Sequence, residues 1–233
     1  LGAHHCICFE VLSDEAIYQR INIFNPHIIL CRSKLEFKLN NIKLKYKLND
    51  LKLHVIDLPS LIRDKSNIKT SLSKSYKYKS KLFTLFTSGS TGLPKAIVHG
   101  GRDFINYAKF TTKYYFGIGK EKTMFSAVDA GWINGHTYSF YGPLLLGGKS
   151  IINEYPLLIT MPNLIGKYFE KLKPDCFYTS VTLLRLIKSV TPKNKNIYDF
   201  FKEKSINYLL DRIGSCGEPL AHSVGEWSIK FFQ

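Results

Sequence analysis

The sequence has no apolar run approaching the roughly 18 residues that a membrane-spanning helix needs, and we therefore expect no membrane partner. Cysteine is scarce as well, with five residues that are odd in number and scattered along the chain. Such a set excludes a disulfide framework and favours the cytoplasm or another reducing intracellular compartment. These cysteines are Cys6, Cys8, Cys31, Cys176 and Cys216.

Four potential metal ligands lie close together near the start of the chain. Neighbouring residues along a strand point to opposite faces of a sheet, so the side chains of such a row cannot converge on one ion. We interpret residues 4–9 as a buried strand and assign no metal site. The four side chains are His4, His5, Cys6 and Cys8.

Acidic residues are few: 18 Asp and Glu stand against 33 Lys and Arg, which gives a formal net charge of +15. A surplus of this size can attract nucleic acid or a membrane surface, because both carry phosphate. Much of it lies within residues 34–81, where lysines alternate with apolar or small residues. We interpret this segment as a solvated, flexible insert with an ordered strand at 53–56, and expect no nucleic-acid partner. The alternative is a basic binding module whose affinity for nucleic acid or a membrane surface would be lost when the segment is removed.

Limited trypsin digestion tests the interpretation of this insert. High charge and weak periodicity predict that residues 34–81 include the most protease-sensitive part of the chain. The first cuts should therefore map within this segment when the products are identified by mass spectrometry. First cuts elsewhere would contradict the assignment of a flexible insert.

Strand and helix patterns alternate along the rest of the chain. Ser13 suits an N-cap with Asp14 and Glu15 in the first helical turn, and Asn25 followed by Pro26 ends that helix. This alternation predicts an α/β domain with largely parallel sheets flanked by helices, whose ligands gather at the carboxyl ends of strands. Further strands are expected at 27–31, 82–86, 96–99, 123–128, 149–152, 176–178 and 208–213, and further helices at 103–115, 162–172 and 181–189, the last with Ser180 as its N-cap.

A loop of small residues between two strands carries the clearest chemical signal. Glycine lets the backbone approach a ligand closely, hydroxyl groups donate hydrogen bonds, and Lys95 adds a positive charge, so the loop suits a triphosphate. It is not a Walker loop, because Pro94 precedes the lysine and Ala96 follows it. The strands flank it too closely for a flexible linker. The loop consists of Thr87, Ser88, Gly89, Ser90, Thr91, Gly92, Leu93, Pro94 and Lys95.

The segment TSGSTGLPKA resembles the phosphate-binding signature of the adenylate-forming superfamily, which holds acyl-CoA synthetases, luciferases and peptide-synthetase adenylation domains. The segments DAGWINGHTYSFY and IGSCGEP are similar to those of acetyl-CoA synthetases and their propionyl relatives. The opening LGAHHCICFEVLSDEAIYQRI also resembles that family, so the resemblance covers nearly all of residues 1–233 outside the insert. It implies part of an AMP-binding N-terminal domain without the small C-terminal domain.

The resemblance implies a role for each matching residue. The loop would bind the ATP phosphates, with Lys95 as the catalytic cation. Three residues depart from the pattern of acetate enzymes, which usually have Thr at Asn134, Val at Cys216 and Gly at Ala96. Taken singly, Trp132 would be a core aromatic, Gly135–His136 a turn and Cys216 a buried thiol. The resemblance assigns Gly217, Glu218 and Pro219 to the adenine and ribose, and Trp132, Ile133, Asn134 and Cys216 to the acyl group and CoA.

The implied activity is that of an acyl-CoA synthetase: ATP activates acetate or a similar short carboxylic acid, and the acyl group then passes to CoA, with Mg²⁺ as cofactor. Two alternatives stay open, a synthetase for propionate or longer acids and a non-catalytic truncated relative. The chain starts without Met and stops within a helical pattern, and the family's later motifs are not found before Gln233. We therefore expect this chain alone to form no acetyl-CoA above background.

Overall fold

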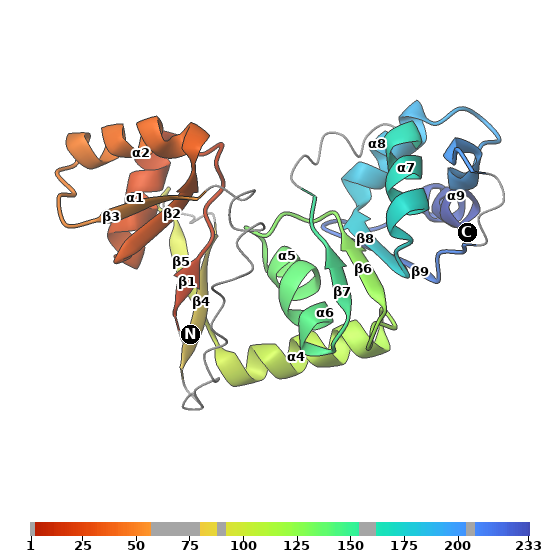
Figure 1. Ribbon diagram of the computed structural model, residues 1–233, viewed down its shortest axis with the longest axis horizontal. Coiled ribbons are helices and arrows are strands. Elements are labelled where there is room, and N and C mark those ends of the chain that lie inside the picture. The colour runs from red at the N-terminus through yellow and green to blue at the C-terminus, as the bar shows by residue number, and fades with distance from the viewer. Residues whose placement is uncertain (1–2, 57–79, 88–91, 154–161, 204–207) are drawn as a thin grey trace. The chain divides into compact units, whose positions relative to one another are not determined.

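The computed structural model describes residues 3–56, 80–87, 92–153, 162–203 and 208–233 (Figure 1). The chain divides into two compact units, Leu1–Gly101 and Arg102–Gln233, and each is described by itself.

The described residues of the first unit form two small sheets and two helices. One sheet has the order β1-β4-β5, in which β1 and β4 are parallel and β4 and β5 antiparallel. The other is the parallel pair β2 and β3. The elements are β1 (His5–Cys6), α1 (Asp14–Phe24), β2 (Ile28–Arg32), α2 (Ser33–Lys45), β3 (Lys52–Ile56), β4 (Lys81–Thr87) and β5 (Lys95–Gly100).

Helix α1 begins and ends where the sequence predicts. The Ser13 hydroxyl accepts a hydrogen bond from the Ala16 N–H at 3.2 Å, which satisfies one of the unpaired donors of the first turn. Asn25 closes the helix in the left-handed conformation with φ of 50°. Ile17 is buried in the small core that α1 and α2 share with β2 and β3. The first predicted strand, in contrast, is limited to His5–Cys6, and the His4 ring is hydrogen-bonded to the Thr84 hydroxyl at 2.8 Å.

Helix α2 occupies a place where the lysine-rich pattern led us to expect a loop. Leu39 and Ile42 are buried against β2 and β3, and Tyr46 stacks on Tyr18 with ring centroids 3.7 Å apart. Leu39 and Ile42 therefore lie on the packed face of the helix, whereas Phe37 and Leu44 are 79% and 78% exposed. Strand β3 confirms the expected strand at 53–56. Residues 57–79 of the proposed insert lie outside the described part of the chain.

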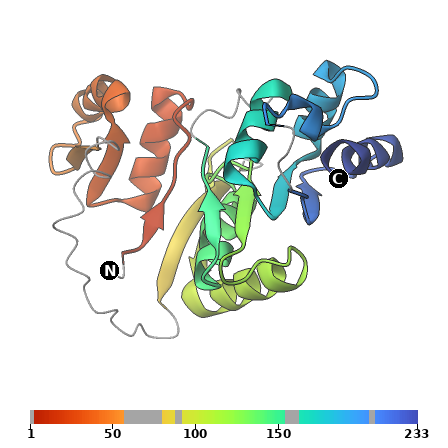
Figure 2. The ribbon, with the colours of Figure 1, turned by 45° about the vertical axis from the view of Figure 1, so that its right-hand side comes forward.

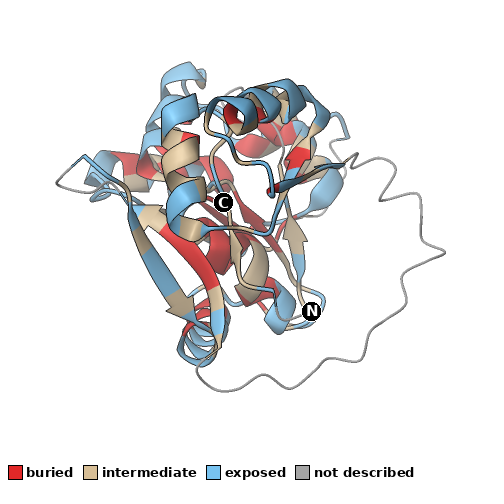
Figure 3. Ribbon diagram, turned by 90° about the vertical axis from the view of Figure 1, so that its left-hand side faces the viewer, coloured by how far each residue is buried: buried red, intermediate tan, exposed pale blue. Residues whose placement is uncertain are grey.

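Strands β4 and β5 form an antiparallel hairpin, an exception to the expected parallel order. Phe83, Thr84 and Leu85 in the middle of β4 are buried, whereas β5 is largely exposed (Figure 3). The pairing ends with Thr87 opposite Lys95, so the two residues mark the base of the connecting loop.

The second unit is built on a four-stranded, all-parallel sheet of order β7-β6-β8-β9 (Figures 1 and 2). Helices cover both of its faces, as the alternating pattern predicts. Among the described helices, none is long and apolar enough to cross a membrane. The elements are α4 (Gly101–Tyr114), β6 (Thr123–Ser126), α5 (Ile133–Gly135), the π-helix η2 (His136–Tyr141), α6 (Gly142–Leu145), β7 (Lys149–Ile151), α7 (Pro162–Leu172), β8 (Cys176–Ser180), α8 (Val181–Val190), the 3-10 helix η4 (Ile197–Phe200), β9 (Arg212–Cys216) and α9 (His222–Phe232).

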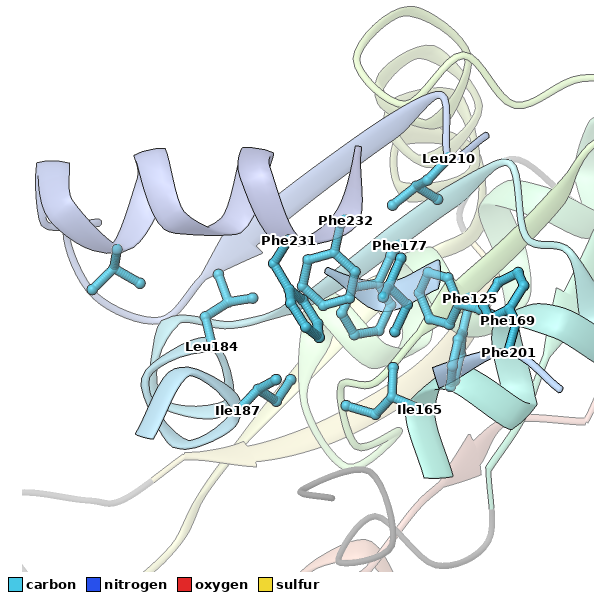
Figure 4. Close-up of a cluster of buried hydrophobic side chains, with 12 residues drawn as sticks. Phe125, Ile165, Phe169, Phe177, Leu184, Ile187, Phe201, Leu210, Phe231 and Phe232 are labelled. Carbon is cyan, nitrogen blue, oxygen red and sulfur yellow. The ribbon is translucent and has the colours of Figure 1, made fainter. Parts of the chain in front are cut away.

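The larger core of this unit lies between the sheet and helices α7, α8 and α9. Phe125 of β6 and Phe177 of β8 point into it from neighbouring strands, with ring centroids 5.3 Å apart. Phe169 of α7 and Phe232 of α9 meet Phe177 from the helices, at 5.4 and 5.2 Å (Figure 4). Burial of these rings holds the three helices on this face.

The opposite face of the sheet packs against η2. Tyr138 of η2 lies edge-on to Tyr178 of β8, with ring centroids 4.9 Å apart, and Phe116 lies beside both rings. Met124 and Cys176 complete this smaller core, and burial raises the pKa of the Cys176 thiol to about 12. Cys176 is therefore a neutral core residue.

A charged cluster fixes the amino ends of the strands. The Lys122 ammonium contacts Asp175 at 2.5 Å and Asp211 at 3.0 Å, and the Asp175 carboxylate also accepts the Thr123 N–H at 2.7 Å. These contacts join the starts of β6, β8 and β9. Strand β9 runs over Arg212–Cys216 rather than 208–213, because Arg212 pairs with Cys176 while the Tyr208 hydroxyl bonds the Pro174 carbonyl. The opposite, carboxyl edge is left for ligands.

Candidate functional site

The described residues of the phosphate loop lie at its two ends. Thr87 is the last residue of β4, Lys95 is the first residue of β5, and both are exposed. Gly92 has φ of +81°, a conformation that side chains with a Cβ rarely adopt. Ser88, Gly89, Ser90 and Thr91 lie outside the described residues.

The hairpin makes the base of this loop suitable for an anion. Because Thr87 and Lys95 are opposed across the two strands, a hydroxyl donor and an ammonium group begin and end the same loop. Both are accessible, and a lysine side chain is flexible. The two groups are therefore available to an anion at the surface.

The carboxyl ends of three neighbouring strands meet at one edge of the four-stranded sheet. Ser126, at the end of β6, pairs with Tyr178, and Ser180, at the end of β8, pairs with Cys216, at the end of β9. The segments that follow these strands therefore leave the sheet at the same edge. The first is residues 129–134, which we call the acyl segment because the resemblance assigns Trp132, Ile133 and Asn134 to the acyl group and CoA. The second is the start of helix α8. The third is residues 217–223, which join β9 to α9 and include the first two residues of α9; we call them the connection.

The acyl segment projects a tryptophan from the sheet edge. The Trp132 side chain is 59% exposed, so the interpretation of this residue as a core aromatic is wrong. Asp129 shapes the turn before it, because its carboxylate accepts the Gly131 N–H at 2.7 Å and its carbonyl accepts the Trp132 N–H at 3.1 Å. Ile133 is 38% exposed and Asn134 is half-buried. An exposed indole and a half-buried amide two residues apart can both contact an organic ligand.

Gly135 and His136 do not form the turn that their sequence suggests. Gly135 ends the short helix α5, and buried His136 begins the π-helix η2. π-Helices are rare and occur frequently at functional sites. Here the wide turns place Tyr138 against the sheet directly behind the acyl segment.

Cys216 lies on the face of the sheet that η2 covers, together with Tyr178. The Cys216 side chain is half-buried against the smaller core. Burial, with a hydrogen bond to Cys216, raises the pKa of the Tyr178 hydroxyl, which therefore stays neutral. The acyl segment follows β6 and Cys216 ends β9, so both are reached from the carboxyl edge of the sheet.

The connection after β9 begins with a glycine in the left-handed region, where Gly217 has φ of +94°. The next residue, Glu218, uses its carboxylate within the chain: it accepts a hydrogen bond from Thr182 at 2.8 Å and pairs with Arg185 at 3.0 Å. Pro219 is exposed. The sequence analysis missed Thr182 and Arg185, because only the fold brings the start of α8 beside this connection.

The candidate residues thus form two groups, one in each unit. Thr87, Gly92 and Lys95 belong to the loop of the first unit. In the second unit the sheet brings Trp132, Ile133, Asn134, Cys216, Gly217, Glu218 and Pro219 to one edge.

Comparison with known proteins gives a family and a set of relatives. The family described as "AMP-binding enzyme" matches residues 1–233. Acetyl-coenzyme A synthetase 2 of Candida albicans is 33% identical over 253 residues, covering 99% of this chain and 37% of that protein. The protein of the same name from Debaryomyces hansenii is 39% identical over 249 residues, covering 97% of this chain and 36% of that protein. The chain therefore spans less than two-fifths of the length of these relatives.

Solved structures share the fold at lower identity. The acyl-CoA synthetase of Brucella canis has a TM-score of 0.74 and 21% identity, and the match covers 99% of this chain and 41% of that one. The anthranilate CoA ligase AuaEII, in complex with anthranoyl-AMP, also has a TM-score of 0.74, with 17% identity and coverage of 99% and 43%. These matches confirm the predicted α/β fold.

Proposed function

Because the chain belongs to the AMP-binding enzyme family, we propose that the protein uses ATP to activate acetate or a similar short carboxylic acid and passes the acyl group to CoA. The observation that carries the proposal is the carboxyl edge of the four-stranded sheet, where the segment that contains Trp132 and Asn134 follows β6 and where Cys216 ends β9. The proposed reaction also needs a cation beside the triphosphate, and the exposed Lys95 at the base of the phosphate loop supplies it. The named relatives are acetyl-coenzyme A synthetases, which supports the choice of acid.

The proposed reaction has two displacements. A carboxylate oxygen attacks the α-phosphorus of ATP, the bond to the β-phosphate oxygen breaks, and pyrophosphate leaves. The sulfur of CoA then attacks the acyl carbon, AMP leaves with the bonding electrons, and the thiol proton passes to solvent. No protein nucleophile is needed, so positioning and neutralisation of negative charge supply most of the rate. Lys95 and the loop amides would perform the neutralisation, and the sheet edge would perform the positioning.

Mg²⁺ is proposed as a companion of ATP rather than as a resident ion. Within the described ranges of the chain, no cluster of three or more His, Cys, Asp or Glu side chains could hold a metal ion. Mg²⁺ is commonly bound through substrate phosphates with few protein ligands. We therefore assign it no protein ligand among those residues.

We also propose a reducing compartment for the protein. All five cysteines are free, and burial raises the pKa of Cys31 as well as that of Cys176. These features suit a chain whose thiols stay reduced.

A panel of carboxylic acids in a pyrophosphate-release assay on the full protein tests the proposed function. Acetate should give the highest kcat/KM, with decreasing values as the acyl chain lengthens. A preference for propionate or longer acids would replace acetate in the proposal, and no release with any acid would indicate a non-catalytic relative.

Cys216→Trp is expected to reduce the use of larger acids before that of acetate. The half-buried thiol lies beside Tyr178, so an indole at this position overfills the space for an acyl chain. The measurement is kcat/KM for acetate, propionate and butyrate. Cys216→Ala should have the opposite effect, and Cys8→Trp, at an exposed cysteine of the first unit, is the control. Equal loss for every acid together with loss of ATP binding would assign Cys216 to the nucleotide instead.

A further inference from the structure

Three side chains of helix α8 contact the connection that carries the proposed adenine segment. Thr182 donates its hydroxyl to one carboxylate oxygen of Glu218 at 2.8 Å, and Arg185 donates to the other at 3.0 Å. Lys188 donates to the Ser223 carbonyl at 2.8 Å. The three donors are spaced three residues apart, so they lie along one face of the helix. We call them the α8 row.

Apart from the first hydrogen bonds of α9, in which the Ala221 carbonyl accepts the Val224 and Gly225 N–H groups, and a contact between His222 and Glu226, the connection has little other support. Its residues from Gly217 to Ser223 are all exposed, so apolar packing contributes little to its conformation. Ala221, the N-cap of α9, has no side-chain oxygen to hold the start of that helix. Segments with few buried contacts open locally at small free-energy cost. The α8 row therefore supplies a large part of what orders residues 217–223.

The contacts also decide what Glu218 can offer a ligand. Both carboxylate oxygens are engaged within the chain, one by Thr182 and one by Arg185. A nucleotide at this edge would therefore meet the backbone of the connection and Pro219, rather than a free carboxylate. An uncompensated carboxylate would also repel the negatively charged triphosphate.

We propose that Thr182, Arg185 and Lys188 are positioning residues, which hold residues 217–223 in the conformation that receives the adenine and ribose of ATP. The proposal rests on the proposed function and adds residues that lie outside the recognised motifs. Because exposed ion pairs contribute little to global stability, the effect should appear in local order and in nucleotide binding, with little change in melting temperature.

A double-mutant cycle between Arg185 and Glu218 tests the proposal. In the full chain, Arg185→Met and Glu218→Gln should each speed amide hydrogen exchange over 217–223 and weaken ATP binding about two- to fivefold. The double variant should bind ATP no more weakly than the weaker-binding of the two single variants, because Arg185 acts through Glu218. Arg185→Lys should recover part of the affinity. Lys171→Met, at an exposed lysine in the last turn of α7, is the charge-matched control and should change neither quantity.

The outcomes separate the two proposals. Unchanged hydrogen exchange in Arg185→Met, or additive losses in the double variant, would overturn the positioning role. A fall in ATP affinity of the same size in Lys171→Met would assign the effect to net charge and overturn it as well. If the unmodified chain binds no ATP, the proposed function fails, and the exchange rates over 217–223 still decide whether the α8 row orders the connection.

Discussion

In the full-length enzyme, Lys95→Ala should lower the rate of adenylate formation about tenfold to a hundredfold while leaving the fold intact. Lys95 is exposed at the first position of β5, so removing its side chain creates no cavity. A charge-assisted hydrogen bond to a phosphate is worth roughly 1.5–3 kcal/mol, which sets the size of the loss. ATP–pyrophosphate exchange is the measurement, with acetate as the acid.

Lys81→Ala is the matched control for this experiment. Lys81 is also exposed and lies at the opposite end of the same hairpin, where it pairs with Gly100. The Lys81→Ala substitution removes one positive charge from the same sheet, as Lys95→Ala does, but it changes no residue of the phosphate loop. Equal rates in the unmodified protein and in Lys95→Ala would remove Lys95 from the site, and equal losses in both variants would reduce its role to net charge.

Gly135→Ala should destabilise the second unit by about 3 kcal/mol, the upper end of the usual cost of overpacking. A Cβ at this buried position would lie 2.0 Å from the Asp129 carbonyl oxygen and 2.7 Å from the Ala130 Cα. Both atoms belong to the backbone of the turn before Trp132, so no flexible side chain can move aside. The melting temperature should fall by about 6–12 °C.

Gly119→Ala provides the comparison within the same unit, because a Cβ at Gly119 meets no atom within 4 Å. Its melting temperature should stay close to that of the unmodified protein. If Gly135→Ala melted at the same temperature as Gly119→Ala, the tight packing of α5 on the turn at Asp129 would be refuted. The added Cβ would also push the turn at Asp129, and with it Trp132, out of place. The folded fraction of the Gly135→Ala variant should therefore have a lower kcat/KM for acetate.

Local signals in the sequence predicted much of the fold. The hydroxyls of Ser13 and Ser180 both cap helices where expected, accepting hydrogen bonds from Ala16 and Leu183. Each cap depends on residues three positions apart, which a sequence pattern can display. The strands of the four-stranded sheet were found for the same reason, because their apolar runs are short and bounded by turn residues.

The errors arose where distant residues decide the structure. Helix α2 depends on the burial of Leu39 and Ile42 against β2 and β3, and the lysines on either side of this pair concealed the apolar spacing. Strand β9 was placed four residues too early because its pairing with β8 sets its start at Arg212. In the candidate site, the contacts of Glu218 with α8 join residues that are more than thirty positions apart. The roles of the site residues themselves remain predictions.

The order of strands in the second unit determines when its sheet can be completed on the ribosome. Strand β8 pairs with β6, which precedes it, but its other edge awaits β9, so Ser180 has no partner until Cys216 has been synthesised. At roughly 5–20 residues per second the intervening chain takes about 2–7 s to appear. During that interval Phe177 and Tyr178 lie on a strand with one open edge. The nascent sheet therefore keeps an unpaired strand edge, at which another chain can pair, until residues 212–216 are available.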